Sequence, residues 1–183
     1  MLFSLFPTVE YKNTPTTDIY RDYRTYFKRV LKNYKPRSYQ ITGAFRPEQL
    51  AYLLYNNQQL YWVLTMLNNV YDPFYDWITT QETAYNAVTQ KYSKVGGNHV
   101  VYHIDKNNEK YYDLVEYPER SGKWYHKNDK DHEYLQYDGV LVPIDTYEDS
   151  LIINEGKREI LIISPSDINS FVSDLIKEME KSK

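Results

Sequence analysis

RPEQLAYLLYNNQQLYWVLTMLNNVYDPFYDW, residues 46–77, is the stretch that decides the fold of this chain. It has no charged side chain between Glu48 and Asp72, and Asn and Gln residues interrupt its apolar run every few positions. A proline suits the first turn of a helix over 47–55, and a second helix is expected over about 59–67. The stretch therefore predicts a compact pair of short helices with more apolar and aromatic groups than its own small core can bury. Such a unit either holds a ligand or is built into something larger, and we favour the second.

The segments before this pair predict an arm, a helix and a strand. Residues 1–16 carry scattered apolar side chains without a clear period, which indicates an extended arm whose apolar groups need a surface to cover them. A strand on the protein's own sheet fits this segment equally well. Apolar and aromatic residues at helical spacing predict a helix over 18–34, and alternating side chains predict a strand over 37–41.

The segments after the pair predict a further helix, a hairpin and a helix–strand–helix region. Capping-box spacing starts a helix at Thr79 that reaches about Tyr92. Strands over 100–104 and 109–115 flank a polar turn that is typical of a hairpin. Residues 117–138 are expected to form long loops with a short strand. The remaining expected elements are a helix that starts at Thr146 and ends near Gly156, a buried strand over 159–163 and a final helix that Ser164 caps.

Together these elements predict an α+β protein with an N-terminal arm, a two-helix unit with a small sheet, and a C-terminal β-hairpin followed by the helix–strand–helix region. A chain of 183 residues suits one domain, or two small ones that share a core. The expected segments are the arm and first helix at 1–36, the helical unit at 37–92, the β-hairpin and long loops at 93–143, and the helix–strand–helix region at 144–183.

Composition bounds the possible functions. The formal net charge of −3 favours neither a nucleic-acid partner nor an anionic membrane surface. The absence of cysteine excludes disulfides and cysteine-based zinc sites. The longest nearly apolar run, residues 60–67, is far shorter than the ~20 residues that span a bilayer, and no basic secretory leader is present. Tyrosine is the outlier, with 21 positions against six for phenylalanine, and both protein interfaces and half-buried strands favour it.

No group of residues points to catalysis, a cofactor or a metal ion. His99 and His103 would lie about 13 Å apart on the expected strand, too far to share a metal ion. His126 and His132 could bind a metal ion together with Asp129 and Asp131, but solvated loop residues are the favoured interpretation, because no known zinc or calcium ligand spacing surrounds them. The sequence therefore predicts no catalytic, cofactor-binding or metal-binding residue, and we expect that the protein is not an enzyme.

A basic segment precedes the helical pair. Residues 18–37 hold seven cations and two anions, with aromatic residues between them. Three interpretations stay open: nucleic-acid binding, an amphipathic helix with a solvated face, and a charged surface that steers assembly with charged neighbours. The solvated face is favoured over nucleic-acid binding.

The order of these signals resembles a known family, the small baseplate wedge proteins encoded by gene fifty-three of T-even-type contractile-tailed phages. The resemblance covers nearly the whole chain and is weakest at residues 117–138. The blocks that carry it are Met1-Leu2-Phe3, Thr17-Asp18-Ile19, Tyr26-Phe27-Lys28-Arg29, Arg46-Pro47-Glu48-Gln49-Leu50-Ala51, Leu60-Tyr61-Trp62-Val63-Leu64, Tyr71-Asp72-Pro73, Trp77-Ile78-Thr79, Lys91-Tyr92, Val95-Gly96-Gly97, Val101-Tyr102-His103, Asp145-Thr146-Tyr147-Glu148 and Ser166-Asp167-Ile168-Asn169-Ser170-Phe171.

This resemblance implies a structural role in the virion. A protein of this family joins the inner wedge of the tail baseplate, clamps other wedge proteins and helps neighbouring wedges close around the central hub. The resemblance also implies several copies in a six-fold symmetric assembly that forms in the host cytoplasm. No nucleic acid and no membrane are expected among the partners.

The helical pair also resembles a LysM-type fold, in which two short helices pack on a two-stranded sheet. Carbohydrate-binding LysM modules usually begin their first helix with a Gly-Asp-Thr/Ser-Leu turn, whereas this chain has RPEQL at 46–50. The difference favours a fold reused for protein contacts. The alternative is a module that binds cell-wall glycan (peptidoglycan) and uses Tyr61, Trp62, Tyr75 and Trp77 as stacking platforms for sugar rings.

The candidate functional residues are therefore those expected to contact protein partners. They come from the arm, from the basic face of the first helix and from the aromatic residues of the helical pair. The set is Phe3, Phe6, Arg24, Lys28, Arg29, Tyr61, Trp62, Tyr75 and Trp77. As large aromatic residues, Trp62 and Trp77 also suit the core of the helical pair, which is the favoured interpretation of both.

Overall fold

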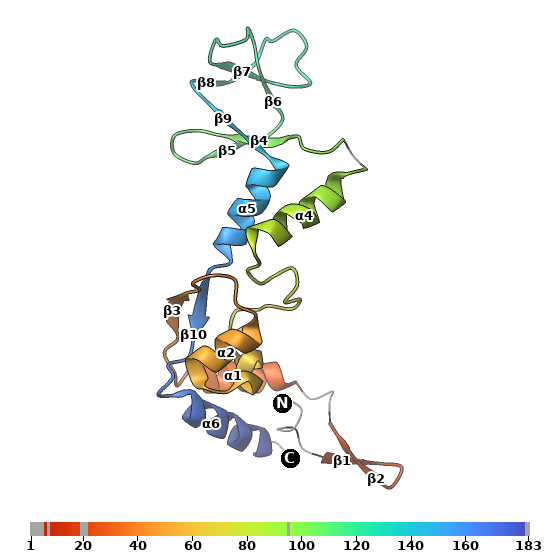
Figure 1. The fold of residues 1–183 in the computed structure, drawn as a ribbon, viewed down its shortest axis with the longest axis vertical. Helices are drawn as coiled ribbons and strands as arrows, with labels where there is room; N and C mark the ends of the chain where they lie inside the picture. Colours follow the sequence, from red (N-terminus) through yellow and green to blue (C-terminus); the bar gives the residue numbers. More distant parts are fainter. Residues whose placement is uncertain (1–5, 7, 19–21, 95, 182–183) are drawn as a thin grey trace. The chain divides into compact units, whose positions relative to one another are not determined.

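The computed structural model describes residues 6, 8–18, 22–94 and 96–181, and it confirms an α+β protein (Figure 1). The contacts divide the chain into two compact units. Unit 1 holds residues 1–79 and 156–183, and unit 2 holds residues 80–155. This division regroups the four expected segments. The helix that follows Thr79 belongs with the hairpin region, and the C-terminal strand and helix belong with the N-terminal part of the chain.

A strand pair between distant segments explains this regrouping. β3 (Arg37–Gln40) runs antiparallel to β10 (Glu159–Ile162) in a two-stranded sheet of unit 1. Residues of β10 alternate between exposed and buried. The expected strand forms, but its expected full burial is wrong, because only one face of β10 packs on the core and the other face is exposed.

One side chain covers the free edge of β10. The amide nitrogen of Asn68 donates to the carbonyl oxygen of Leu161 at 2.8 Å, and its amide oxygen accepts from the Leu161 N–H at 2.7 Å. A backbone N–H and C=O at a sheet edge need partners, and this asparagine satisfies both as a third strand would. Asn68 thereby joins the end of the helical pair to the sheet.

The helices of unit 1 pack against this sheet and against one another. They are α1 (Tyr23–Leu31), α2 (Pro47–Tyr55), the 3-10 turn η2 (Gln58–Leu60), α3 (Tyr61–Leu67) and α6 (Ile168–Glu180). The carboxylate of Asp22 caps α1 by accepting from the Thr25 N–H at 3.3 Å. The final helix starts later than expected, because the carbonyl of Ser164 accepts the Asp167 N–H in a turn before α6 begins.

α3 lies between two apolar clusters and is buried on nearly every side. Trp62 packs with Phe27 and Phe171 in the first cluster, whereas Leu64 belongs to the second. The buried members of the first cluster are Phe6, Phe27, Val30, Trp62, Val63, Leu67, Ile163, Ile168, Phe171, Leu175 and Met179, and those of the second are Ile41, Leu50, Ala51, Leu64, Trp77, Ile78, Ile160 and Ile162. The expected surplus of apolar groups is thus wrong for α3, whose side chains fill the protein's own core.

Two short helices and a two-stranded antiparallel sheet therefore lie together in unit 1, with α2 and α3 in contact and α3 against β10. The sheet takes its second strand from the C-terminal part of the chain rather than from the segment that follows the helices. The likeness to LysM modules stays a prediction.

Unit 2 is built from small antiparallel sheets and the helices α4 (Gln81–Tyr92) and α5 (Thr146–Gly156). One sheet has the order β5-β4-β9 and the other has the order β6-β7-β8. The strands are β4 (Val100–Ile104), β5 (Lys110–Tyr111), β6 (Leu114–Glu116), β7 (Lys123–His126), β8 (Leu135–Asp138) and β9 (Val142–Asp145). Two strands, β7 and β8, form where long loops with one short strand were expected, because β7 pairs with β6 along one edge and with β8 along the other.

The described part of the N-terminal arm forms a hairpin of its own. β1 (Thr8–Tyr11) pairs antiparallel with β2 (Thr14–Thr17), and every residue of both strands is exposed. The expected extended arm and the alternative of a strand on the core sheet are both replaced by this hairpin over residues 8–17. Phe6, in contrast, is buried in the first cluster.

Tyr55 joins the two clusters of unit 1 and predicts a pH effect. Its ring packs against both clusters, and its hydroxyl donates to the Ile163 carbonyl oxygen at 3.1 Å. Burial raises the pKa of Tyr55 to about 12, whereas an unfolded tyrosine has a pKa near 10. The neutral phenol is therefore favoured by folding, and its contribution to stability is complete below about pH 10 and is lost as the pH rises through about 12.

Tyr55→Phe is expected to cost about 1 kcal/mol of unfolding free energy at pH 7, because the hydrogen bond to Ile163 is lost. Above about pH 10 the difference between variant and native protein should shrink, since phenylalanine does not ionise. Urea unfolding at a series of pH values measures both effects. A difference that stays constant up to pH 12 would contradict the assigned role of the hydroxyl. Tyr52→Phe, at an exposed position of the same helix, is the matched control.

Candidate protein-contact surface

The basic face of α1 borders a hollow of about 170 Å³ next to α3. Its lining residues are Arg24, Phe27, Lys28, Leu31, Met66, Leu67 and Asn69. The apolar residues belong to the first cluster or pack against it, so the floor is fixed by the core. Arg24 and Lys28 add two positive charges to the lining. We call this site the α1 hollow.

Arg24 is held in place by Tyr71, which lies outside the lining of the α1 hollow. Its guanidinium donates to the hydroxyl of Tyr71 at 2.7 Å and lies 4.4 Å from the centre of the Tyr71 ring. The hydrogen bond to Tyr71 raises the pKa of Arg24 above its ordinary value. Lys28 is exposed and forms no ion pair with any other residue that the structure describes. The α1 hollow therefore presents a fixed cation beside a free one.

A short turn after α3 exposes three aromatic side chains. Tyr71, Phe74 and Tyr75 are 70%, 83% and 74% exposed. The turn is nevertheless well tied: the Asp76 carboxylate accepts from the N–H groups of Tyr71 and Asp72 at 3.2 and 3.1 Å. We call residues 71–76 the aromatic turn. Large apolar groups on a fixed turn, left in water, are typical of contact sites.

Two further bonds hold the aromatic turn. Within it, Asp72 accepts from the Phe74 N–H at 2.9 Å, and the Lys157 ammonium from another part of unit 1 donates to the carbonyl oxygen of Tyr75. Directly after the turn, the buried Trp77 indole donates to the carbonyl oxygen of Phe45 at 2.8 Å. The exposed rings therefore sit on a backbone that is held at both ends.

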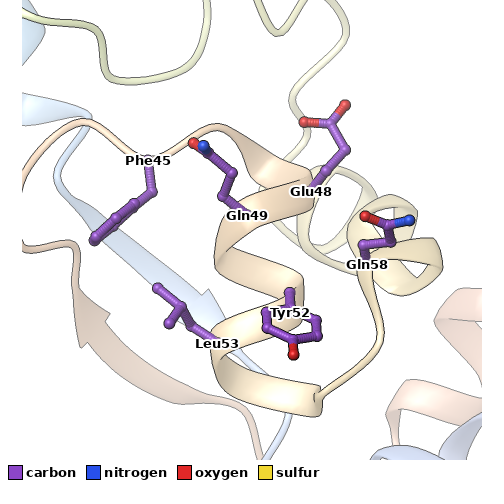
Figure 2. Close-up of a pocket in the computed structure, with 6 residues that line it drawn as sticks. All are labelled: Phe45, Glu48, Gln49, Tyr52, Leu53 and Gln58. Carbon is purple, nitrogen blue, oxygen red and sulfur yellow. The ribbon is translucent and has the colours of Figure 1, made fainter.

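The outer face of α2 borders a second, more open hollow of about 280 Å³ (Figure 2). Figure 2 shows Phe45 and Leu53 on the same side of the helix, with Tyr52 next to them on its outer surface. Tyr52 and Leu53 are more than half exposed. The lining residues are Phe45, Glu48, Gln49, Tyr52, Leu53 and Gln58. No titratable pair with catalytic geometry is present among them, so the hollow suits an apolar contact better than a reaction.

The histidines do not form a metal-binding cluster in the described residues. The ring of His132 stacks on Tyr117 with 3.9 Å between the ring centres, and His126 accepts from the Asn128 N–H. Burial lowers the pKa of His103 on β4, whose Nδ1 is buried without a hydrogen-bond partner. Within the described ranges, no group of three or more His, Asp or Glu side chains could hold a metal ion. Across the same residues, no helix has the length and apolar character to cross a membrane.

Comparison with known proteins decides the family. A family model described as "Base plate wedge protein 53" matches residues 1–178. The chain belongs to this family. The baseplate wedge protein gp53 of enterobacteria phage T4 is 52% identical over 191 aligned residues, which cover the whole of this chain and 97% of that relative. The resemblance seen in the sequence is therefore confirmed.

For this member of the Base plate wedge protein 53 family, the structure separates the candidate contact residues into two groups. Arg24, Lys28 and Tyr75 lie on the surface, and Tyr61 is 37% exposed. Arg29 is also exposed, but its guanidinium lies 3.7 Å from the Glu178 carboxylate and so links α1 to α6. Arg24 and Lys28 both line the α1 hollow, since residues four apart share one face of a helix, and their role as contact residues stays a prediction.

The other candidates do not offer an accessible side chain. Phe6 is buried in the first cluster, and Trp62 and Trp77 are only 4% and 2% exposed. These three residues, expected at a contact surface, are therefore core residues, because each ring packs among apolar residues of unit 1. Phe3 lies outside the described residues. Buried tryptophans cannot stack on sugar rings, which removes the main support for glycan binding.

Sequence reasoning missed several exposed aromatic residues of this family member. Tyr71 and Phe74 were not singled out, although they stand beside an Asp-Pro turn that favours exposure. Tyr52 and Leu53 were missed too. A signal for them existed, because Glu48, Gln49 and these two residues recur at spacings of four and mark one mixed polar and apolar face of α2.

Proposed function

We propose that this protein is a non-enzymatic structural subunit of a phage tail baseplate wedge, which clamps neighbouring wedge proteins and helps wedges join around the central hub. The family match over residues 1–178 carries the proposal, together with the 52% identity to a baseplate wedge protein of phage T4. The protein would be present in several copies in a six-fold symmetric baseplate. It would reach the virion through assembly in the host cytoplasm.

The α1 hollow supports a clamp that uses charge as well as apolar contact. A fixed guanidinium, a free ammonium and an apolar floor suit a segment that carries an acidic residue beside an apolar one. Residues 18–37 carry a net charge of +5, whereas the whole chain carries −3. Positive and negative regions on one chain favour ordered contacts with charged neighbours and oppose wrong ones.

The aromatic turn supports a second contact. Contact hot spots are rich in tyrosine and other aromatic residues that a rigid backbone presents, since little conformational entropy is lost when they bind. Phe74 and Tyr75 meet this description, because the Asp76 and Lys157 bonds hold their backbone. Tyr71 belongs to the aromatic turn and also bonds to Arg24 of the α1 hollow. The two sites are therefore continuous in unit 1.

The double variant Arg24→Gln, Lys28→Gln tests the clamp. Loss of both charges is expected to lower incorporation of the protein into tails by about tenfold, since charge pairs at protein contacts are each worth on the order of 1 kcal/mol or more. The measurement is the amount of this chain per tail in purified phage, by quantitative mass spectrometry. Circular dichroism should match the native protein, because both side chains are exposed or at the rim of the hollow.

Lys32→Gln, Lys35→Gln is the matched control, since it removes the same charge from exposed positions outside the lining of the α1 hollow. Equal incorporation of the two double variants would contradict a role for the α1 hollow. The wider proposal has its own test: phage that lack the protein should not assemble infectious tails. Infectious particles without the chain, or bond cleavage by the purified protein, would overturn it.

A further inference from the structure

The β1–β2 hairpin has no core of its own. All of its residues over Thr8–Tyr11 and Thr14–Thr17 are exposed, and among the residues that the structure describes its strands pair only with each other. A two-stranded hairpin of this kind is marginally stable in water unless another element adds to it. Four of its eight strand residues are threonine and one is valine, types that favour strands. The hairpin thus has a composition that favours strands, but its strand residues are not covered by another described element.

The turn fixes which backbone groups of the hairpin face outward. Lys12 and Asn13 both have positive φ, 48° and 58°, as in a two-residue type I′ turn. In such a hairpin the residues that flank the turn, Tyr11 and Thr14, exchange hydrogen bonds, and every second pair does the same. Val9 and Thr16 are therefore bonded across the hairpin. The N–H and C=O groups of the intervening pairs point away from it.

The two outer edges differ in their capacity to pair. On β1 the outward groups belong to Thr8 and Glu10, each with an N–H and a C=O. On β2 they belong to Pro15 and Thr17, and proline has no N–H to donate. Proline at an edge position is a known obstacle to further strand pairing. The β2 edge is blocked, and the β1 edge is open.

Side chains add a preference to the open edge. Val9 and Tyr11 share one face of β1 and are 45% and 62% exposed, whereas Glu10 points to the opposite face. A strand added along β1 would meet an apolar face on one side and a carboxylate on the other. If a second copy added its own β1 in antiparallel fashion, the two Glu10 side chains would become diagonal neighbours, and like charges there are unfavourable.

We propose that the open edge of β1 receives an extended strand of a different baseplate protein, so that the hairpin becomes part of a sheet shared between two chains. The added strand would carry apolar or β-branched residues over Val9 and Tyr11 and a Lys or Arg near Glu10. Backbone bonds to Thr8 and Glu10 give the attachment, and the side-chain pattern gives the specificity. This inference rests on the proposed function, since it takes the partner from the assembled baseplate.

Amide hydrogen exchange at single-residue resolution tests the edge directly. In the purified chain, the amides of Thr8, Glu10 and Thr17 should all exchange at rates near those of an unpaired strand. In intact tails, the Thr8 and Glu10 amides should be protected at least about tenfold, and the Thr17 amide should stay fast. Fast exchange at Thr8 and Glu10 in tails that contain the chain would overturn the inference and leave the proposed function standing.

Matched proline variants test whether the edge matters for assembly. Glu10→Pro removes an outward N–H from β1, and Thr17→Pro removes an outward N–H from β2. Glu10→Pro is expected to reduce incorporation into tails about tenfold, since one edge bond is lost and the ring obstructs the added strand, while Thr17→Pro should be neutral. Equal effects of the two variants would overturn the assignment of the open edge.

Glu10→Lys tests the side chain separately from the backbone, because it keeps every backbone group of residue 10 and reverses only the charge. It should lower incorporation several-fold if a basic residue lies opposite, and an unchanged level would exclude that part of the inference. Protection of Thr8 and Glu10 that appears in the purified chain with rising concentration would show a second copy on the edge and would overturn the partner assigned here. Absence of the native chain from tails would refute the proposed function instead.

Discussion

Phe171→Ala should unfold unit 1 or leave it barely folded. Phe171 lies at the centre of the first cluster with 0% exposure, and its ring packs edge-on against Phe27 and Tyr34 at centre-to-centre distances of 5.0 and 5.3 Å. Truncating a buried phenylalanine costs about 3–5 kcal/mol, which is a large part of the ~5–15 kcal/mol that stabilises a typical domain. The loss weakens the packing of α6 on α1, because the Phe171 ring contacts Phe27 of α1.

Urea unfolding followed by far-UV circular dichroism and by tryptophan fluorescence measures this loss. Trp62 reports on the same cluster, so its emission should shift at lower urea in the variant than in the native protein. Ser170→Ala, at the exposed neighbouring position of α6, is the control and should change stability by less than about 0.5 kcal/mol. A Phe171→Ala protein as stable as that control would mean that the first cluster does not hold unit 1 together.

Trp124→Ala should have the corresponding effect on unit 2. The buried cluster of this unit is small, with Leu114, Trp124 and Leu141 as its members. The indole donates to the carbonyl oxygen of Gly139 at 2.9 Å, and its ring centre lies 4.7 Å from that of His103. Removal of a buried tryptophan costs about 3–5 kcal/mol, and a core with so few members has little to replace it.

Amide hydrogen exchange distinguishes the two units in this experiment. Protection in β7 and β8 should be lost in Trp124→Ala, whereas β3 and β10 of unit 1 should keep theirs. Trp124→Phe retains most of the ring but not the bond to Gly139, so it should cost only about 1 kcal/mol beyond the loss of ring area. Exchange that rises equally in both units would show that they unfold as one, and would contradict the independence of the two cores.

Local signals predicted the helical pair well. The proline at position 47 and the helical spacing after it gave a helix over 47–55, and α2 spans Pro47–Tyr55. Capping-box spacing from Thr79 predicted the next helix, but the cap lies one residue later: the Thr80 hydroxyl accepts the Thr83 N–H at 3.2 Å, and α4 begins at Gln81. These features depend on residues within four positions of each other. They are therefore present in the sequence itself.

Features that depend on distant residues were predicted poorly. Residues 117–138 show no clear alternation, yet β7 becomes a strand because β6 and β8 pair with both of its edges. The expected buried strand over 159–163 has an exposed face, since Ile160 and Ile162 pack in the second cluster whereas Leu161, on the other face, is exposed. Neither outcome follows from the residues of the segment alone.

The candidate contact surface shows the same limit. Phe74, Tyr75 and Trp77 lie within four positions of one another, and all are large aromatic residues. Two of them are among the most exposed large hydrophobic side chains in the part of the chain that the structure describes, and the third is buried. Tertiary contacts accompany this difference: Trp77 packs in the second cluster and its indole donates to the carbonyl oxygen of Phe45, whereas the bonds of Asp76 hold the turn that carries the exposed rings.

By itself, the sequence determined the α+β class, the short helices and the family, because each rests on residue identity or on spacing within a few positions. Only the tertiary structure decided that the chain forms two units and that α3 is enclosed by two clusters. It also decided which aromatic rings remain in water. The physical reason is that these features depend on contacts between residues far apart in the sequence. Tyr34 bonds to Asp174 and Asn68 bonds to Leu161 across long stretches of chain, and no local sequence pattern indicates such contacts.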